Sequence, residues 1–98
     1  MSAPWPFEDP PNTAVIVDRR IIPGGAWIAR VSHDLDDGGW QFLTNSDRPL
    51  TVEDGSIVGL GRIVAYDPSV AELADLPMGW RAWRESAHAP WQRIELSS

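Results

Sequence analysis

The shortness of the chain is the constraint that most limits its fold. It has 98 residues, the size of one small domain. A chain of this size buries only about two-thirds of the surface that its unfolded form exposes, so it has one modest core. Cysteine is absent, which excludes disulfides, thiolate metal ligands and a cysteine nucleophile. We therefore expect one small domain with little room for a deep substrate cavity and no second, catalytic domain.

The charge balance is acidic and excludes two classes of partner. The chain has 14 acidic and 8 basic residues, for a formal net charge of -6. Nucleic acids and anionic membranes attract proteins through Lys and Arg, so both would repel this chain on average. All the basic residues are Arg, whose planar guanidinium suits fixed pairs with carboxylates and stacking on aromatic rings. We expect a protein partner, and neither nucleic acid nor membrane.

Residues 1–12 are predicted to form a proline-rich extended tail, ahead of an ordered domain at 13–98. Proline at this density blocks both a helix and a central strand. Trp5 and Phe7 could pack onto the domain, or the tail could stay mobile, which is the commoner outcome at a terminus. The tail lacks the features of a secretory signal, and no apolar run in the chain approaches the roughly 18 residues of a membrane span. We expect a cytoplasmic protein.

Short β-branched and aromatic runs separated by turn residues predict strands. The expected strands are 14–17 with 21–22, 26–31, 40–43, 56–59, 80–85 and 91–96. Pro23-Gly24-Gly25 supplies turn chemistry, so the first two strands are expected to form a hairpin. Residues 57–66 fit both strand and helical spacing, and we favour a short strand followed by a helical turn at 61–66.

A clearer helix is predicted after residue 66. Asp67 is a good N-cap, and Pro68 suits the first helical position. Apolar residues within 70–74 share one face, and Pro77 ends the helix. Together with the predicted strands, this indicates a small α+β domain with a mainly antiparallel sheet and one or two short helices.

The segment between the strands at 26–31 and 40–43 is acidic and carries Asp34, Asp36 and Asp37. If this segment were a calcium-binding loop starting at Asp34, the fifth position would need an oxygen ligand and the twelfth a bidentate Glu. Gly38 and Asn45 stand at these positions, so both ligands are missing. A solvated loop is the simpler interpretation. We predict no metal site here.

Motifs for catalysis and cofactor binding are weak. Ser32 and His33 are adjacent, but neighbouring strand residues point to opposite faces, and no Gly-x-Ser-x-Gly is present. Gly59-Leu60-Gly61 is followed by Val64 where a dinucleotide fingerprint needs a third glycine, and the chain has no Lys to bind phosphate. We therefore predict no catalytic residue, no cofactor and no enzymatic activity.

Tryptophan is the most informative residue type. The chain has six, and five of them lie within 13–98, more than one small core can fully bury. Trp and Arg are enriched at binding hot spots, and Trp83 between Arg81 and Arg84 is the densest such cluster. The alternative is that these Arg residues pair with nearby acids while Trp83 packs on a neighbour. The predicted partner-binding residues are Asp34, Asp36, Asp37, Arg81, Trp83 and Arg84.

Three stretches occur together in an order that matches a known family. They are Arg20-Ile21-Ile22-Pro23-Gly24-Gly25, Asp36-Asp37-Gly38-Gly39-Trp40-Gln41-Phe42 and Tyr66-Asp67-Pro68-Ser69-Val70. They resemble the opening hairpin, the Asp-Ser-Gly-Trp-x-Phe signature and the Tyr-Asp-Pro helix of the immunity protein 33 domain, also called domain of unknown function 2185. The resemblance covers residues 13–85. It departs at Gly38, where Ser is usual, and at Trp83, where Phe is usual.

The resemblance implies a bacterial protein that neutralises a cognate toxin by binding it, without catalytic residues. The net charge, the acidic loop and the surplus of Trp and Arg favour a basic partner. One alternative is a structural or regulatory accessory domain whose tryptophans fill the core or a homodimer interface. Another, a small-ligand sensor or an enzyme, requires a pocket with convergent polar groups.

Overall fold

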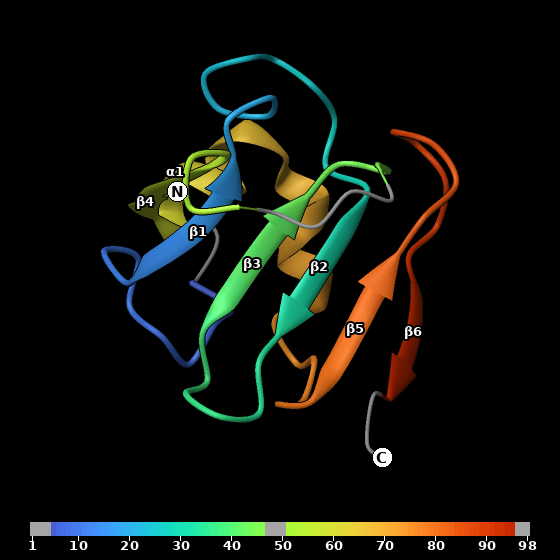
Figure 1. Ribbon diagram of the computed structural model, residues 1–98. Coiled ribbons are helices and arrows are strands. Elements are labelled where there is room, and N and C mark those ends of the chain that lie inside the picture. The colour runs from blue at the N-terminus through green and yellow to red at the C-terminus, as the bar shows by residue number, and fades with distance from the viewer. Residues whose placement is uncertain (1–4, 47–50, 96–98) are drawn as a thin grey trace.

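A six-stranded sheet with two short helices packed on one face forms the fold (Figure 1). The computed structural model describes residues 5–46 and 51–95. The strands are β1 (Ala14–Asp18), β2 (Arg30–His33), β3 (Trp40–Leu43), β4 (Gly55–Gly59), β5 (Trp80–Trp83) and β6 (Gln92–Glu95); the helices are α1 (Leu60–Tyr66) and the 3₁₀ helix η1 (Pro68–Leu73). The predicted small α+β class is confirmed.

The sheet is mixed but mainly antiparallel. Its strand order is β4-β1-β3-β2-β5-β6, so β4 and β6 form the two edges. Among the described strands only β1 and β3 pair in parallel, and the remaining neighbours are antiparallel. β2 and β3 form a hairpin, and the predicted acidic loop is the connection between them.

The predicted hairpin about Pro23-Gly24-Gly25 is wrong. β1 pairs with β3 and β4 rather than with the next strand, and the strand expected at 26–31 is shifted to β2. The connection 19–29 instead forms a loop at one end of the sheet, with the Ile21 and Ile28 side chains fully buried. Its apolar residues therefore pack without joining the sheet, while the apolar run of β1 lies between two neighbouring strands.

The segment around residue 60 folds as predicted, with a strand followed directly by a helix. The next helix begins at the expected N-cap, where the Asp67 carboxylate accepts the backbone N–H of Ser69 at 3.1 Å and Pro68 takes the first helical position. This second helix is 3₁₀ rather than α. In the part of the chain that the structure describes, neither helix has the length and apolar character needed to cross a membrane.

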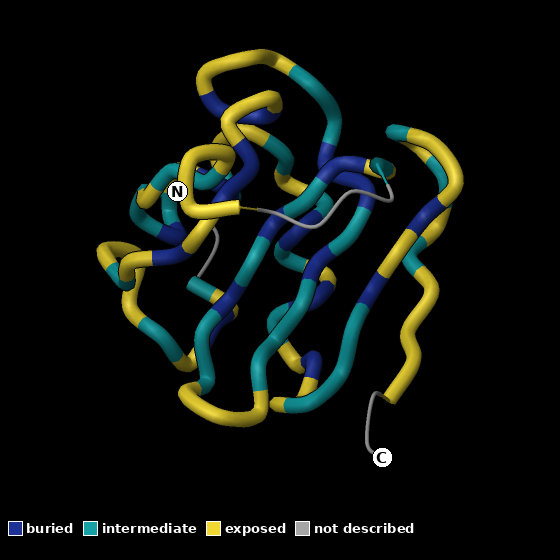
Figure 2. The backbone as a smooth tube through the Cα atoms, in the orientation of Figure 1, coloured by how far each residue is buried: buried dark blue, intermediate teal, exposed yellow. Residues whose placement is uncertain are grey.

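The core lies between the sheet and the helices (Figure 2). Its fully buried side chains include Val17, Val31, Phe42 and Ala82 of the strands and Leu60, Ile63, Val70 and Leu73 of the helices. Phe7 is also buried, so the core includes a residue of the predicted tail. Of the two alternatives for the tail, packing onto the domain is the one seen in its described residues. Residues 1–4 lie outside the described part.

The opposite face of the sheet is free of helices, and we call it the open face. It carries several partly exposed large side chains, which are Ile16, Ile57, Trp83 and Ile94. In Figure 1 this face is turned toward the viewer, with α1 and η1 behind the strands.

Candidate functional site

The six predicted partner-binding residues lie in three separate places. The three Asp residues belong to the β2–β3 connection, at the lower end of the sheet in Figure 1. Arg81 and Trp83 lie on β5, on the open face. Arg84 follows β5 and turns to the helix side, where it bonds to η1. The structure therefore does not assemble the six into one surface.

Asp34 has an internal role in the β2–β3 hairpin. One of its carboxylate oxygens accepts the Ser32 hydroxyl at 2.8 Å, and the other accepts the Gln41 amide at 2.9 Å. Asp36 and Asp37 at the tip of the connection are exposed. Of the predicted acidic trio, these two are the exposed ones, although one Asp37 carboxylate oxygen also accepts the backbone N–H of Gly39 at 2.8 Å.

Two exposed apolar side chains lie together beside this acidic connection. Leu35 is 66% exposed and Met78 is 52% exposed, and both line a shallow cavity of about 190 Å³. Gly79, with φ +85°, makes the turn that places Met78 there. A Cβ at Gly79 would lie 3.6 Å from the Leu35 side chain, so the two segments are in close contact.

Carboxylates from three segments lie near this apolar pair. Glu8 of the N-terminal segment, Asp37 of the β2–β3 connection and Asp75 after η1 line a second cavity together with Met78, and Asp36 lies between Leu35 and Asp37 in the chain. We call these four carboxylates, with Leu35 and Met78, the acidic end. Of the described residues lining the two cavities here, none is Arg. Asp75 forms an ion pair with Arg93 at 2.8 Å, so the acidic end keeps an excess of negative charge.

A stacked aromatic floor holds the acidic end in place. The rings of His33 and Trp40 stack with centroids 3.8 Å apart, and Phe7 meets Trp40 edge-on at 5.4 Å. The His33 Nδ1 lies 2.7 Å from the carbonyl oxygen of Leu76, and because a carbonyl only accepts, this nitrogen carries the hydrogen. The Trp40 indole donates to the Asp9 carboxylate at 2.9 Å. These contacts join the hairpin, the N-terminal segment and the turn after η1.

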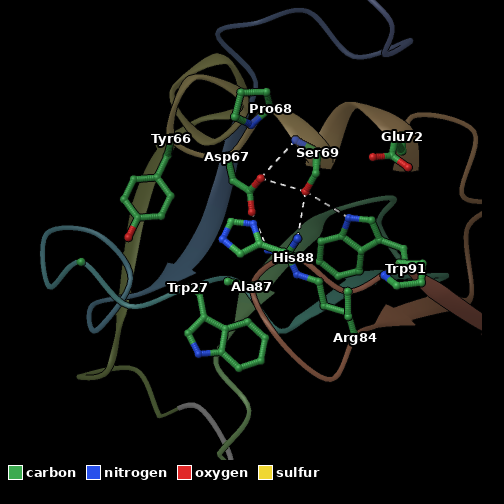
Figure 3. Close-up of a pocket in the computed structure, with 13 residues that line it drawn as sticks. Trp27, Tyr66, Asp67, Pro68, Ser69, Glu72, Arg84, Ala87, His88 and Trp91 are labelled. Atoms are coloured by element: carbon green, nitrogen blue, oxygen red, sulfur yellow. Dashed lines mark hydrogen bonds and ion pairs between the residues drawn. The ribbon is translucent and has the colours of Figure 1, made fainter.

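A larger concavity lies elsewhere, on the helix side (Figure 3). It has a volume of about 680 Å³, and its walls include Trp27, Tyr66, His88 and Trp91. This pocket keeps the small-ligand alternative open, since such a function requires a concavity with polar groups.

Arg84 is buried beneath this pocket and is held from several sides. It is 4% exposed. Its guanidinium donates to the carbonyl of Ile28 at 2.8 Å, to the Ser69 hydroxyl at 3.0 Å and to the Asp67 carboxylate at 2.5 Å. The Trp91 ring stacks over it at 4.2 Å. We call Asp67, Ser69, Arg84 and Trp91 the Arg84 clamp, because they tie η1 to the end of β5.

The pocket brings a Ser, a His and an Asp together without forming a nucleophile and base. The Ser69 hydroxyl donates to Asp67 at 2.8 Å and accepts from Arg84 and from Trp91, the latter at 3.2 Å. Those bonds use its one hydrogen and both lone pairs. No hydrogen bond joins it to His88 among the described residues. Imidazole activation of this hydroxyl would require breaking the clamp.

Burial raises the pKa of Asp67, but hydrogen bonds from Ser69 and Arg84 outweigh it and lower the pKa of the carboxyl overall. Asp67 is therefore an anion paired with a buried cation. This pairing neutralises the floor of the pocket and leaves Glu72 as its uncompensated charge.

The position of Arg84 corrects the expectation of a surface cluster with Trp83. The two side chains point to opposite faces of the sheet, as the period of two in a strand requires. The strand predicted at 80–85 already contained Arg84, and alternation from Ala82 along it would have placed Arg84 on the core side. The sequence did not indicate that Asp67 would be its partner, because 17 residues separate the two.

Arg81 and Trp83 remain together on the open face. Arg81 lies between Ser32 of β2 and Ile94 of β6, and its Nε is buried without a hydrogen-bond partner in the described structure. Trp83 is 39% exposed. The predicted contact role of these two residues stays a prediction.

The residues that the structure describes contain no cluster of three or more His, Asp or Glu side chains that could hold a metal ion. Comparison of the chain with protein-family models, with curated proteins and with solved structures finds no match in any of the three. The resemblance to the immunity protein 33 domain therefore stays a prediction.

Proposed function

We propose that the chain is a non-enzymatic, protein-binding module that recognises a basic protein through the acidic end. The observation that carries this proposal is the exposed pair Leu35 and Met78, which lines two cavities that also contain several carboxylates. Protein interfaces combine an apolar centre with a polar rim, and they bury such a pair far better than a small ligand does. Methionine also adapts its shape to an incoming surface.

The charge of this surface specifies the partner. Asp36, Asp37 and Glu8 form no ion pair among the described residues, so their carboxylates are available to Arg or Lys side chains of a partner. The net charge of -6 would steer such a partner toward the chain and would raise the association rate at low salt.

The finer proposal is that the partner is a toxin, which the chain neutralises in the bacterial cytoplasm by covering a basic surface. The resemblance to the immunity protein 33 domain supports it, since the signature-like stretch 36–42 comprises the tip of the acidic end and β3. The rigid aromatic floor supports it as well, because a preorganised surface loses less freedom on binding.

Co-expression with the product of the adjacent reading frame tests the proposal. We expect that product to be toxic alone, to be tolerated with this chain, and to co-purify with it. Replacing Leu35 and Met78 together by serine should abolish protection and co-purification. Ile57→Ser, a matched loss of an exposed apolar side chain on β4, should preserve both. A neighbour that is harmless alone and does not co-purify would contradict the proposal.

A further inference from the structure

β6 is a free edge of the sheet. Among the described strands its only neighbour is β5, and all four of its residues are exposed. In Figures 1 and 2 it lies at the side of the molecule, beyond the region that the helices cover. No proline or bulge protects residues 92–95, although such devices commonly block edge strands.

The hydrogen-bond pattern shows which backbone groups of β5 face β6. On a strand with two antiparallel neighbours, successive residues bond alternately to one side and to the other. The backbone N–H of Arg84 donates to the carbonyl of Ala29 at 3.1 Å, on the β2 side. By alternation the backbone N–H and C=O of Ala82 also point toward β2. The backbone groups of Arg81 and Trp83 therefore point toward β6.

The register then fixes the free groups of β6. Arg81 is opposite Ile94, and Trp83 is opposite Gln92. The backbone N–H and C=O groups of Gln92 and Ile94 therefore form hydrogen bonds with β5. The N–H and C=O groups of the alternate residues, Arg93 and Glu95, point away from the sheet into solvent.

We propose that this edge pairs antiparallel with β6 of a second copy of the chain, about a two-fold axis through Ile94. In that register Arg93 is opposite Glu95 of the second copy, and Glu95 is opposite Arg93 of the second copy. The outward N–H and C=O groups of both residues then complete four backbone hydrogen bonds between the copies. Two six-stranded sheets become one continuous sheet.

Several registers would place the helices of both copies on the same side of the joined sheet. Charge complementarity selects the register with the axis through Ile94 among them. Opposite charges directly across an antiparallel pair are favourable, and like charges are unfavourable. A two-fold axis through Arg93 or through Glu95 would place that residue opposite its own copy. The axis through Ile94 instead forms two opposite-charge pairs and brings together the two Ile94 side chains, each 51% exposed in the single chain.

Arg93 is already positioned for this contact. Its guanidinium donates to the carbonyl of Glu72 at 2.7 Å and to the Asp75 carboxylate at 2.8 Å. Because the side chain is fixed on the helix-side face, Glu95 of a second copy meets it with little further loss of side-chain freedom. Glu95 also lines the cavity of Leu35 and Met78, and Arg93 pairs with Asp75, so this edge adjoins the acidic end. Self-association of the chain alone is measured without a partner, so failure of dimerisation and failure of partner binding remain distinguishable.

Sedimentation equilibrium over a range of protein concentrations tests the proposal on the full chain. We expect a reversible dimer for the unaltered protein. Glu95→Arg places Arg opposite Arg93 in both pairs and should weaken dimerisation about tenfold or more. Glu95→Pro removes an outward N–H without removing a bond to β5, and should also weaken it. Glu85→Arg, the same charge change at an exposed position outside β6, is the matched control and should leave the dimer intact.

A charge exchange makes the test specific to the register. Arg93→Glu alone, like Glu95→Arg alone, should dimerise about tenfold or more weakly than the unaltered protein. Mixing the two variants should restore a mixed dimer, because each pair again joins Arg to Glu, and native mass spectrometry would identify that species. Far-UV circular dichroism confirms that each variant is folded. A monomeric unaltered protein at millimolar concentration, or a dimer indifferent to both Glu95→Arg and Glu95→Pro, would overturn the proposal.

Discussion

Trp40 joins the core to the acidic end, and its replacement by alanine is expected to destabilise the fold by about 4 kcal/mol. The side chain is 3% exposed, and truncation of a buried aromatic ring costs about 3 to 5 kcal/mol through lost burial and the cavity that remains. The indole also donates to Asp9 at 2.9 Å, a bond worth about 1 kcal/mol. Stacking on His33 overlaps with the burial contribution, so we place the total in the upper half of the range.

Urea unfolding followed by far-UV circular dichroism measures the effect. Trp83→Ala is the matched control, since Trp83 is 39% exposed, and it should cost about 1 kcal/mol or less. Small domains have only about 5 to 15 kcal/mol of stability, so Trp40→Phe is a useful second variant. It keeps a ring in the core but loses the N–H, and it should cost about 1 to 2 kcal/mol. A loss below about 1 kcal/mol for Trp40→Ala, or equal losses at the two tryptophans, would refute the reasoning.

Three further outcomes are expected. Arg84→Ala should lower the free energy of unfolding by about 3 kcal/mol, because it leaves Asp67 without its cation; a loss below about 1 kcal/mol in urea unfolding would contradict the clamp. The pKa of Asp67 is lowered in the folded state, so its contribution to stability is present above the unfolded pKa near 3.8 and is lost as the pH falls through the folded pKa. Urea midpoints should therefore fall more steeply with acidification in the unaltered protein than in Asp67→Asn, and parallel curves would argue against this linkage. Replacing Asp36 and Asp37 together by alanine should leave the urea midpoint unchanged while weakening association with the partner and its salt dependence; loss of the fold would show a structural role instead.

The parts of the fold that the sequence predicts well are those fixed by nearby residues. The second helix begins where Asp67 and Pro68 supply a cap and a preset φ, both local properties. The alternation of Trp40 and Phe42 places both on the buried face of β3 without reference to any other strand. In β5 the same alternation buries Ala82 and places Arg81 and Trp83 on the open face.

The errors arise where distant residues decide the outcome. Pro23-Gly24-Gly25 does form turns, but pairing of β1 with β3 brings together residues about 25 positions apart, which no turn signal encodes. Arg84 is buried because Asp67, from another element, neutralises it there. From the sequence, Arg84 is predicted to belong to a surface hot spot. In the folded protein it is buried, because the fold brings Asp67 next to it.

The acidic end shows how stability and the proposed binding depend on the same contacts. Leu35 and Met78 meet because the backbone N–H of Gly79 donates to the carbonyl of His33 at 2.7 Å, which joins the turn before β5 to the β2–β3 hairpin. Glu8 is held between buried Phe7 and Asp9, the residue to which Trp40 donates, so the predicted tail supplies part of the binding surface. Trp40→Phe should therefore weaken partner binding although this side chain is buried, because losing the bond to Asp9 frees the N-terminal segment that carries Glu8.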